Sequence, residues 1–428
     1  MLYNLNVKKR GRDLKRNHLL TALVAVVLLV GSWFAFNYSR QISYVLSSIK
    51  DAGIQLAAVI LSHNPKSVAE IKSHYDPTSQ ARVRILLVPG HEPNYGGAEY
   101  GSLKERDMTV ELAQDLQQLL GNNPHYQVFA TRDGQSWSPE FASYFNDHWN
   151  DISEWQQASH DEEAHLVAIG STTIPLAKVF HNNAPHDVAL RLYGITKWAN
   201  ENDIDIVIHI HFNDYPGHRS GTPGDYSGFT IYVPTAQYGN SGSTRAVADT
   251  IFKRLAKYNP VSNLPGESDG VVDDPELIAI GANNTSDAAS MLIEYSYIYE
   301  PQILNPELRS TAIKDFAFQT YLGLQDFFDP SDSVRIAKPY DTLILPHTWT
   351  NPLADKNAAA PDVFALQTAL TFEGIYPPTG RLKNDCPRTG VIGACTKTAL
   401  QTFQNKYGIS GESGKAEMKT IQTLNTIY

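Results

Sequence analysis

Between residues 83 and 327, the hydrophobic positions alternate between short apolar runs and segments with helical periodicity. The run at 83–88 is short and mostly apolar, as expected of a buried strand, whereas residues 105–120 carry apolar side chains every three or four positions and end before Gly121. This alternation predicts an α/β fold, with an open mixed or parallel sheet and helices on both faces. The pattern predicts strands at 83–88, 126–132, 204–212, 227–234 and 290–296, and helices at 105–120, 187–202, 241–257 and about 306–327.

Three other regions bound or interrupt this α/β domain, which we place at 81–328. Residues 134–186 contain three tryptophans and the acidic sequence HDEEAH, and they form an insertion that either caps a cleft or decorates the surface. Residues 329–361 are rich in proline and polar residues, which is typical of a linker. Residues 362–428 are mostly helical and predict a small all-α domain of three helices.

The N-terminal region has the pattern of a membrane anchor. Its apolar sequence LLTALVAVVLLVGSWFAF is just long enough to cross a hydrocarbon core, so a transmembrane helix is predicted at 19–38. Six basic residues and one acidic residue precede it, which places residues 1–18 in the cytoplasm as a basic tail. Residues 39–80 would then form a stalk. A cleaved signal peptide is the alternative, although the exit from the segment is aromatic rather than small-x-small.

Charge and cysteine content narrow the class of protein. The formal net charge of −10 argues against a nucleic-acid-binding protein, because such proteins need a basic surface. Outside the cytoplasm, Cys386 and Cys395 are expected to form a disulfide that closes a small loop, since two cysteines are too few for a zinc knuckle. We therefore expect a membrane-anchored protein whose folded domains lie in the periplasm or on the cell-wall side.

Histidine and glutamate residues stand at the ends of predicted elements. In VPGHEPNYGGAEYGSLKERD, His91 follows a strand and Glu105 opens a helix. In HIHFND, alternate residues point to one side of a strand, so His209, His211 and Asn213 share a face. Functional groups gather at strand ends in sheets of this kind. The alternative is that the histidines are core residues hydrogen-bonded to the backbone.

These residue types suit a catalytic zinc site. Zinc in such sites usually has three ligands from His and Asp/Glu and a fourth position for water. His91, Glu105 and His211 would supply two nitrogens and one carboxylate oxygen. Glu294, in the otherwise apolar SMLIEYS, is the candidate general base for the attacking water, and a salt bridge or an edge-strand charge is its alternative role.

Five segments of the chain, taken in order and spacing, resemble the zinc-dependent N-acetylmuramoyl-L-alanine amidases of the amidase-3 type. The segments are ILLVPGHEPNYGGAEYGSLKERD, VFATRDG, DVALRLYGITKWANENDIDIVIHIHFND, SGFTIYV and ASMLIEYSY. The resemblance spans about 83–327. It implies that His91, Glu105 and His211 bind zinc and that Glu294 is the catalytic glutamate. It also implies hydrolysis of the amide bond between the lactyl group of N-acetylmuramic acid and the first L-alanine of the peptidoglycan stem peptide.

The resemblance leaves several positions open. Asn213 and Arg132 match family positions, and they either contact substrate or support the site. His209 stands where the family has serine, and it competes as a zinc ligand, hydrogen-bonds the substrate, or fills the serine's place. Glu92 and Pro93 replace the two glycines that usually follow the family's Pro-Gly-His, so the loop is expected to have a different shape.

The sequences DVFALQTAL and LQTFQNKYGIS, within residues 362–428, resemble a peptidoglycan-binding module of the PG_binding_1 type. Together the two resemblances predict an extracytoplasmic zinc amidase that cuts peptidoglycan and holds it through its C-terminal module. One alternative is a non-catalytic wall-tethering protein that kept the amidase fold, and another is a zinc peptidase acting on stem peptides. A regulatory protein partner is left open.

Overall fold

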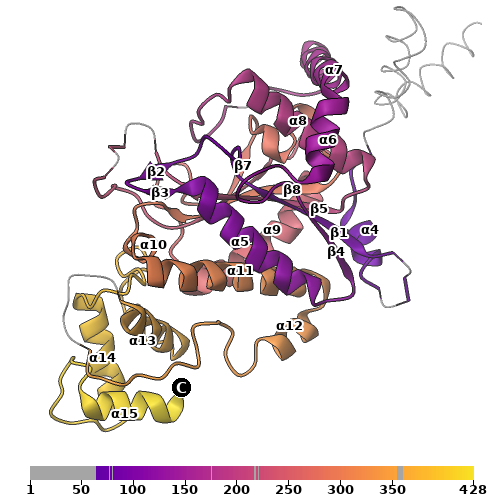
Figure 1. The fold of residues 1–428 in the computed structure, drawn as a ribbon. Helices are drawn as coiled ribbons and strands as arrows, with labels where there is room; N and C mark the ends of the chain where they lie inside the picture. The colour runs from indigo at the N-terminus through magenta and orange to yellow at the C-terminus, as the bar shows by residue number, and fades with distance from the viewer. Residues whose placement is uncertain are drawn as a thin grey trace, which may run out of the picture. The chain divides into compact units, whose positions relative to one another are not determined.

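The computed structural model describes residues 64–428, apart from positions 77, 80, 175, 216, 217, 220 and 354–359 (Figure 1). The predicted basic tail, the apolar segment at 19–38 and most of the predicted stalk lie outside the described residues.

The predicted fold class was wrong as stated, because it included a membrane-spanning helix. Among the helices of the described residues, none combines the length and the apolar character that a bilayer crossing requires. The longest of them, α11 (Pro306–Phe328), carries Arg309, Lys314 and Asp326 along its length, and charges at such positions are costly in hydrocarbon. The architecture of the described residues is a mixed α/β domain followed by a C-terminal helical region.

Six strands form a mixed sheet in the order β4-β1-β5-β8-β6-β7. The first four of these run parallel, β6 runs antiparallel to β8, and β7 runs parallel to β6. Helices on both faces bury the central strands, which explains their nearly continuous apolar sequences. The strands are β1 (Val83–Pro89), β4 (Tyr126–Ala130), β5 (Ile206–Asn213), β6 (Thr230–Pro234), β7 (Val271–Asp274) and β8 (Ala289–Tyr297).

Helices cover both faces of this sheet (Figure 1). One face is covered by α5 (Glu105–Gly121), α9 (Ser241–Tyr258) and α11. These helices pack on the odd-numbered side chains of β1 and the even-numbered side chains of β5, and together they form the main apolar core. On the other face lies α8 (His186–Glu201), joined by α6 (Pro139–Asp147) and α7 (Trp149–Ala168). The odd-numbered side chains of β5, which include His209 and His211, face this second layer.

The insertion region is largely helical and packs on α8. The ring of Phe141 in α6 lies 4.7 Å from the ring of Trp198, and Trp155 in α7 meets Tyr193 edge-on at 6.1 Å.

Strand β7 was not predicted because two of its four residues are aspartates, which break the apolar pattern. The remaining short elements before the C-terminal region are α4 (Val68–Ser73), β2 (Glu99–Tyr100), β3 (Leu103–Lys104), η1 (Ile278–Ile280), η2 (Ala282–Asn284), α10 (Pro301–Leu304) and α12 (Pro330–Ile336).

The C-terminal region contains α13 (Pro361–Phe372), α14 (Ala394–Lys406) and α15 (Met418–Ile427). The predicted disulfide between Cys386 and Cys395 is formed. The loop that it closes carries the buried Arg388, whose Nε donates to the carbonyl oxygen of Tyr258 at 2.8 Å. This arginine therefore ties the disulfide loop to the end of α9.

Candidate active site

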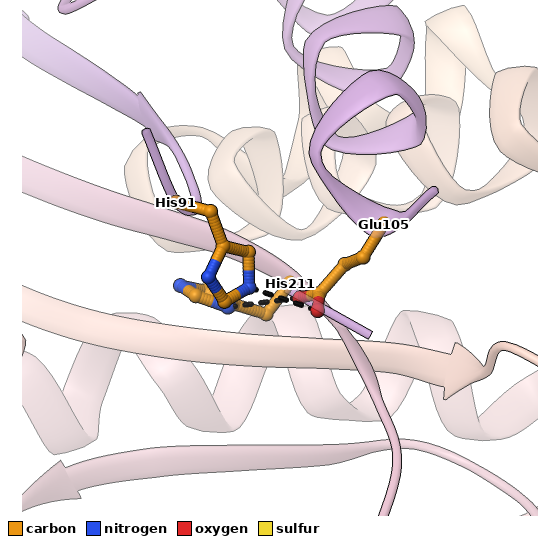
Figure 2. Close-up of side chains that lie close together, drawn as sticks. All are labelled: His91, Glu105 and His211. Carbon is orange, nitrogen blue, oxygen red and sulfur yellow. Dashed lines mark hydrogen bonds and ion pairs between the residues drawn. The ribbon is translucent and has the colours of Figure 1, made fainter. Parts of the chain in front are cut away.

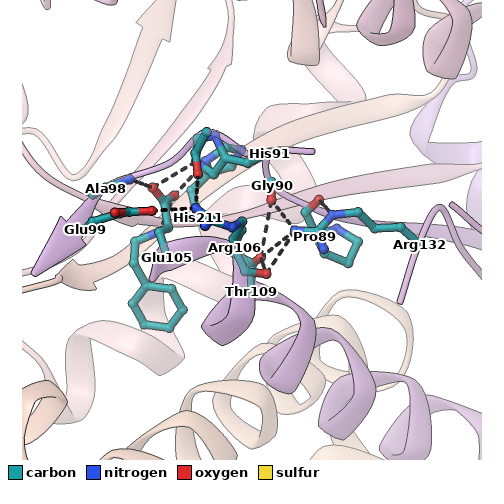
Figure 3. A network of polar contacts seen from close by, with 12 residues as sticks. Pro89, Gly90, His91, Ala98, Glu99, Glu105, Arg106, Thr109, Arg132 and His211 are labelled. Carbon is teal, nitrogen blue, oxygen red and sulfur yellow. Dashed lines mark hydrogen bonds and ion pairs between the residues drawn. The ribbon is translucent and has the colours of Figure 1, made fainter. Parts of the chain in front are cut away.

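Arg132, just after β4, shapes the loop that follows β1 (Figure 3). Its buried guanidinium donates from Nε to the carbonyl oxygen of Pro89 at 3.1 Å. Its Nη2 donates to the carbonyl oxygens of Gly90 and Arg106, the latter at 3.0 Å. One side chain thus joins the end of β1 to the first turn of α5. Of the two roles left open by the sequence, the geometry favours support of the site, because these contacts are all to backbone and to the neighbouring Thr109 hydroxyl.

Small residues let this loop lie directly against β5. A Cβ atom on Gly90 would stand 2.4 Å from Cε1 of His211, closer than any real carbon contact. A Cβ atom on Gly97 would stand 2.8 Å from Cδ2 of His91 and 3.1 Å from Oε2 of Glu105. His91 itself has a φ of 70°, in the left-handed region that few non-glycine residues adopt. The backbone of this loop is therefore specialised to bring side chains close together.

Glu105 is the first residue of α5, and backbone N–H groups from two other segments hold its carboxylate. The N–H of Ala98 donates to Oε2 at 2.8 Å, and the N–H of Phe212 donates to Oε1 at 3.1 Å. Although burial opposes its ionisation, the neighbouring His91 and His211 hold the pKa of Glu105 below its usual range. The carboxylate is therefore an ionised group fixed between the β1 loop and β5.

His91, Glu105 and His211 point toward one another from three separate elements (Figure 2). Each offers one ligand atom, and these atoms lie within 4.8 Å of one another. Nε2 of His91 is 2.8 Å from Oε2 of Glu105, and Nδ1 of His211 is 3.1 Å from Oε1 of Glu105. The structure thus brings together the three residues that the sequence nominated as metal ligands.

This donor set fits Zn²⁺. Two imidazole nitrogens and one carboxylate oxygen leave a fourth tetrahedral position open, as in catalytic zinc sites. Ligand atoms about 2.1 Å from one tetrahedral ion stand about 3.4 Å apart, close to the spacing found here. Nε2 of His91 is buried and makes no well-aligned hydrogen bond among the described residues, although Oε2 of Glu105 lies 2.8 Å away, and a cation held between the two atoms would satisfy both. Burial lowers the pKa of His211, so its ring stays neutral and available as a ligand.

Strand β8 brings Glu294 next to the three candidate ligands, since it is the register partner of His211 on the neighbouring parallel strand. Oε2 of Glu294 is buried and has no hydrogen-bond partner among the described residues. Burial, together with the charges of Glu105 and Glu267, raises the pKa of Glu294 well above its usual value. Such a carboxylate binds a proton strongly, and a cation held by the three neighbouring side chains would favour the ionised form from which a general base starts.

A cleft of about 750 Å³ contains these four side chains, within the range of pockets that bind small ligands. The ends of β1 and β5 and the middle of β8 form its floor. Residues 179–185, from the end of the insertion region, line one wall of it. The insertion therefore reaches the site.

His209 is buried and lies two residues before His211 on the same face of β5, so its Cα is displaced by about 6.6 Å along the strand. It lines the cleft and stays outside the group of three close ligand atoms. Burial, and to a lesser extent His211, lower the pKa of His209 to about 3, so the ring is neutral. Of the three roles left open by the sequence, this position favours filling of the serine's place or contact with substrate.

His209→Ser is therefore expected to retain a full equivalent of metal, because the donor set of three residues remains intact. The check is metal content after gel filtration, measured beside the wild type. His211→Ser, two positions along the same strand face, is the matched control and is expected to lose most of its metal. Loss of metal from both variants would instead make His209 a ligand.

Asn213 lies at the end of β5, and its Nδ2 donates to Oε1 of Glu267 at 3.1 Å. Both residues are buried and line the cleft. Sequence reasoning missed Glu267, which stands in the turn before β7. The only local sequence feature that could have indicated Glu267 is an acidic residue between two turn glycines. Acidic residues in such turns are usually solvated, so the feature does not predict a buried position in the cleft.

Gly90→Ala should disturb the metal site without altering a ligand. An alanine Cβ would overlap the His211 ring, which would have to move away from its position beside Glu105. We expect metal affinity to fall about tenfold or more, measured by competition with a chromophoric chelator. Gly101→Ala is the matched control, since a Cβ there meets nothing within 4 Å among the described residues, although its φ of 62° adds a general backbone cost. Equal metal affinity in wild type and Gly90→Ala would contradict the packing argument.

Comparison with known families agrees with this geometry. Residues 175–324 match the model of the N-acetylmuramoyl-L-alanine amidase family of the amidase-3 type. This match includes His211 and Glu294 and begins after His91 and Glu105, which the structure places beside them. Residues 359–424 match the model of a peptidoglycan binding domain.

Two solved structures illustrate the similarity. The CwlD amidase from Clostridioides difficile, in complex with the GerS lipoprotein, is 14% identical with a TM-score of 0.38, and the match covers 58% of this chain and 100% of that one. The N-acetylmuramyl-L-alanine amidase Ami1 from Mycobacterium smegmatis is also 14% identical with a TM-score of 0.38, over 58% of this chain and 100% of its own. Among curated proteins, none matches this chain.

The protein is thus a peptidoglycan hydrolase that acts on an amide bond, as the resemblance in sequence predicted. More particularly, it carries an N-acetylmuramoyl-L-alanine amidase domain of the amidase-3 type, followed by a peptidoglycan-binding domain.

Proposed function

We propose that this protein is a zinc-dependent amidase that separates stem peptides from the glycan strands of peptidoglycan. The observation that carries the proposal is the convergence of His91, Glu105, His211 and Glu294 on one cleft. The first three form a donor set suited to zinc, and the fourth is a carboxylate with a raised pKa and a buried, unpartnered oxygen. This combination is what metal-assisted hydrolysis of an amide requires.

In the proposed reaction, His91, Glu105 and His211 hold the metal, which when bound supplies Lewis acidity for the amide carbonyl and acidifies a water. Glu294 accepts the proton of the attacking water and then delivers it to the L-alanine nitrogen, so the leaving group departs as a neutral amine. Arg132 keeps the β1 loop and the start of α5 in place through its hydrogen bonds to backbone carbonyls. The raised proton affinity of Glu294 suits it to both transfers.

The same proposal includes binding to the wall and a place outside the cytoplasm. The peptidoglycan-binding domain supports a role in holding the substrate polymer. The disulfide between Cys386 and Cys395 supports an oxidising compartment. The substrate itself lies outside the cytoplasmic membrane, which agrees with both features.

Digestion of purified peptidoglycan by the full-length chain tests the proposal. An amidase releases intact stem peptides with L-alanine at the N-terminus, and mass analysis identifies them. A zinc peptidase would instead release fragments cut within the stem, and a wall-tethering protein would bind the sacculi without releasing any peptide. Either of these outcomes would replace the proposed activity.

A further inference from the structure

One buried acidic side chain that lines the cleft, Glu267, has no assigned role in the mechanism proposed above. Glu267 lies in the turn between α9 and β7, with a side chain only 1% exposed. A buried carboxylate is costly unless several donors compensate it. Its contacts therefore indicate what it is for.

Four donors from separate segments meet the Glu267 carboxylate. The hydroxyls of Tyr232, Ser262 and Tyr297 donate to it, the last at 3.2 Å. The fourth donor is Nδ2 of Asn213, at 3.1 Å from Oε1 and 3.4 Å from Oε2. A carboxylate has about four acceptor positions, so this one is fully used by the protein. Glu267 is therefore held rigidly and is not free to bind a ligand itself.

The contact with Asn213 fixes the orientation of an amide in the cleft. An ionised carboxylate accepts hydrogen bonds and donates none, so the Asn213 NH₂ group must face Glu267. The amide oxygen then faces the opposite way. Among the described residues, the structure gives Asn213 Oδ1 no hydrogen-bond donor, and Asn213 lines the cleft two residues beyond the ligand His211 on the same face of β5. A residue of the cleft lining thereby keeps an acceptor atom that no donor of the described residues uses.

We propose that Glu267 is a positioning residue that orients the Asn213 amide, so that its oxygen accepts an amide N–H of the bound substrate. This inference rests on the proposed function and adds a substrate contact to it. Peptidoglycan offers such N–H groups in its stem peptide and its N-acetyl groups. The partner is thus a secondary amide within hydrogen-bond reach of the end of β5.

Binding of a soluble muropeptide monomer tests the proposal without depending on turnover. It is measured by calorimetry in full-length protein that carries Glu294→Gln. In that background, Glu267→Gln should weaken binding about tenfold. The glutamine NH₂ group can donate to Asn213, so the side-chain amide of Asn213 is free to flip and lose its fixed orientation. Asn213→Asp should weaken binding at least as much, because it sets two carboxylates about 3 Å apart.

The combination Asn213→Asp with Glu267→Gln provides the rescue. The glutamine NH₂ can donate to one oxygen of the new aspartate, which leaves the other oxygen facing the cleft as an acceptor. We expect binding to return to within about threefold of the background protein. Metal content should stay the same in all variants, since none alters a ligand. Ser262→Ala, which removes a different donor from the same carboxylate, is the control and should bind normally.

Two results with the Glu267 variants would overturn the inference. Unchanged binding in Glu267→Gln would show that the carboxylate orients nothing that the substrate contacts. Weakening in the double variant as large as the two single effects together would assign Glu267 a purely structural role. If Glu267→Gln does not fold, Asn213→Leu decides, since normal muropeptide binding without the amide oxygen also rejects the contact. A wild-type protein that neither binds nor cleaves muropeptides would reject the proposed function itself, and the inference with it.

Discussion

Replacement of Glu294 by glutamine is expected to lower turnover of peptidoglycan by about 100-fold or more while the metal content stays unchanged. Glutamine keeps the size of the side chain and cannot accept the proton of the attacking water. The proposed metal ligands lie on the β1 loop, α5 and β5, so a change on β8 leaves this donor set intact. Initial rates of peptide release, measured beside metal analysis of the same preparation, give the check.

Glu276→Gln is the matched control for this experiment. Glu276 also lines the cleft, but its side chain is exposed and lies outside the cluster around the metal ligands. The control should retain nearly normal turnover, which would show that loss of charge in the cleft is not enough to stop the reaction. Turnover within a few-fold of wild type in Glu294→Gln would remove this residue from the mechanism.

Removal of the metal is expected to abolish peptide release, and added Zn²⁺ should restore it. His91, Glu105 and His211 are the side chains that converge on the ligand position, and none of them can replace the Lewis acid for an amide carbonyl. The measurement compares turnover after dialysis against a chelator with turnover after zinc is returned. His211→Ala should behave like the chelated protein and fail to recover.

His181→Gln serves as the control for the metal experiment, because this histidine lines the same cleft and pairs instead with Asp274 at 3.0 Å. It should bind zinc and recover activity as the wild type does. Full turnover in chelated protein that holds less than about a tenth of an equivalent of metal would disprove the dependence on zinc.

Local periodicity was sufficient to locate most elements of the α/β region. The strand expected at 83–88 is β1, and the helix expected at 105–120 is α5. Burial on both faces gives the strand a continuous apolar run, and burial on one side gives the helix an apolar repeat of three or four residues, and a short window of sequence records both patterns. The predicted fold class was wrong in including a transmembrane helix, because no helix of the described residues is long and apolar enough to cross a membrane. The segment at 19–38 lies outside the described residues. Strand β7 was missed because its pairing with β6 outweighs a sequence that contains two aspartates.

The sequence by itself determined that His91 follows a strand, that Glu105 opens a helix and that His211 and Glu294 lie on two further strands, and so nominated these four residues. The proximity of the two histidines follows from chain order, since the parallel strands β1 and β5 end at one edge of the sheet. Only the tertiary structure decided that His209 stays outside the ligand group, that Arg132 holds backbone carbonyls, and that Glu267 reaches Asn213. These outcomes depend on distances of a few ångströms between segments far apart in the chain. Such distances are set by packing, which no local pattern encodes.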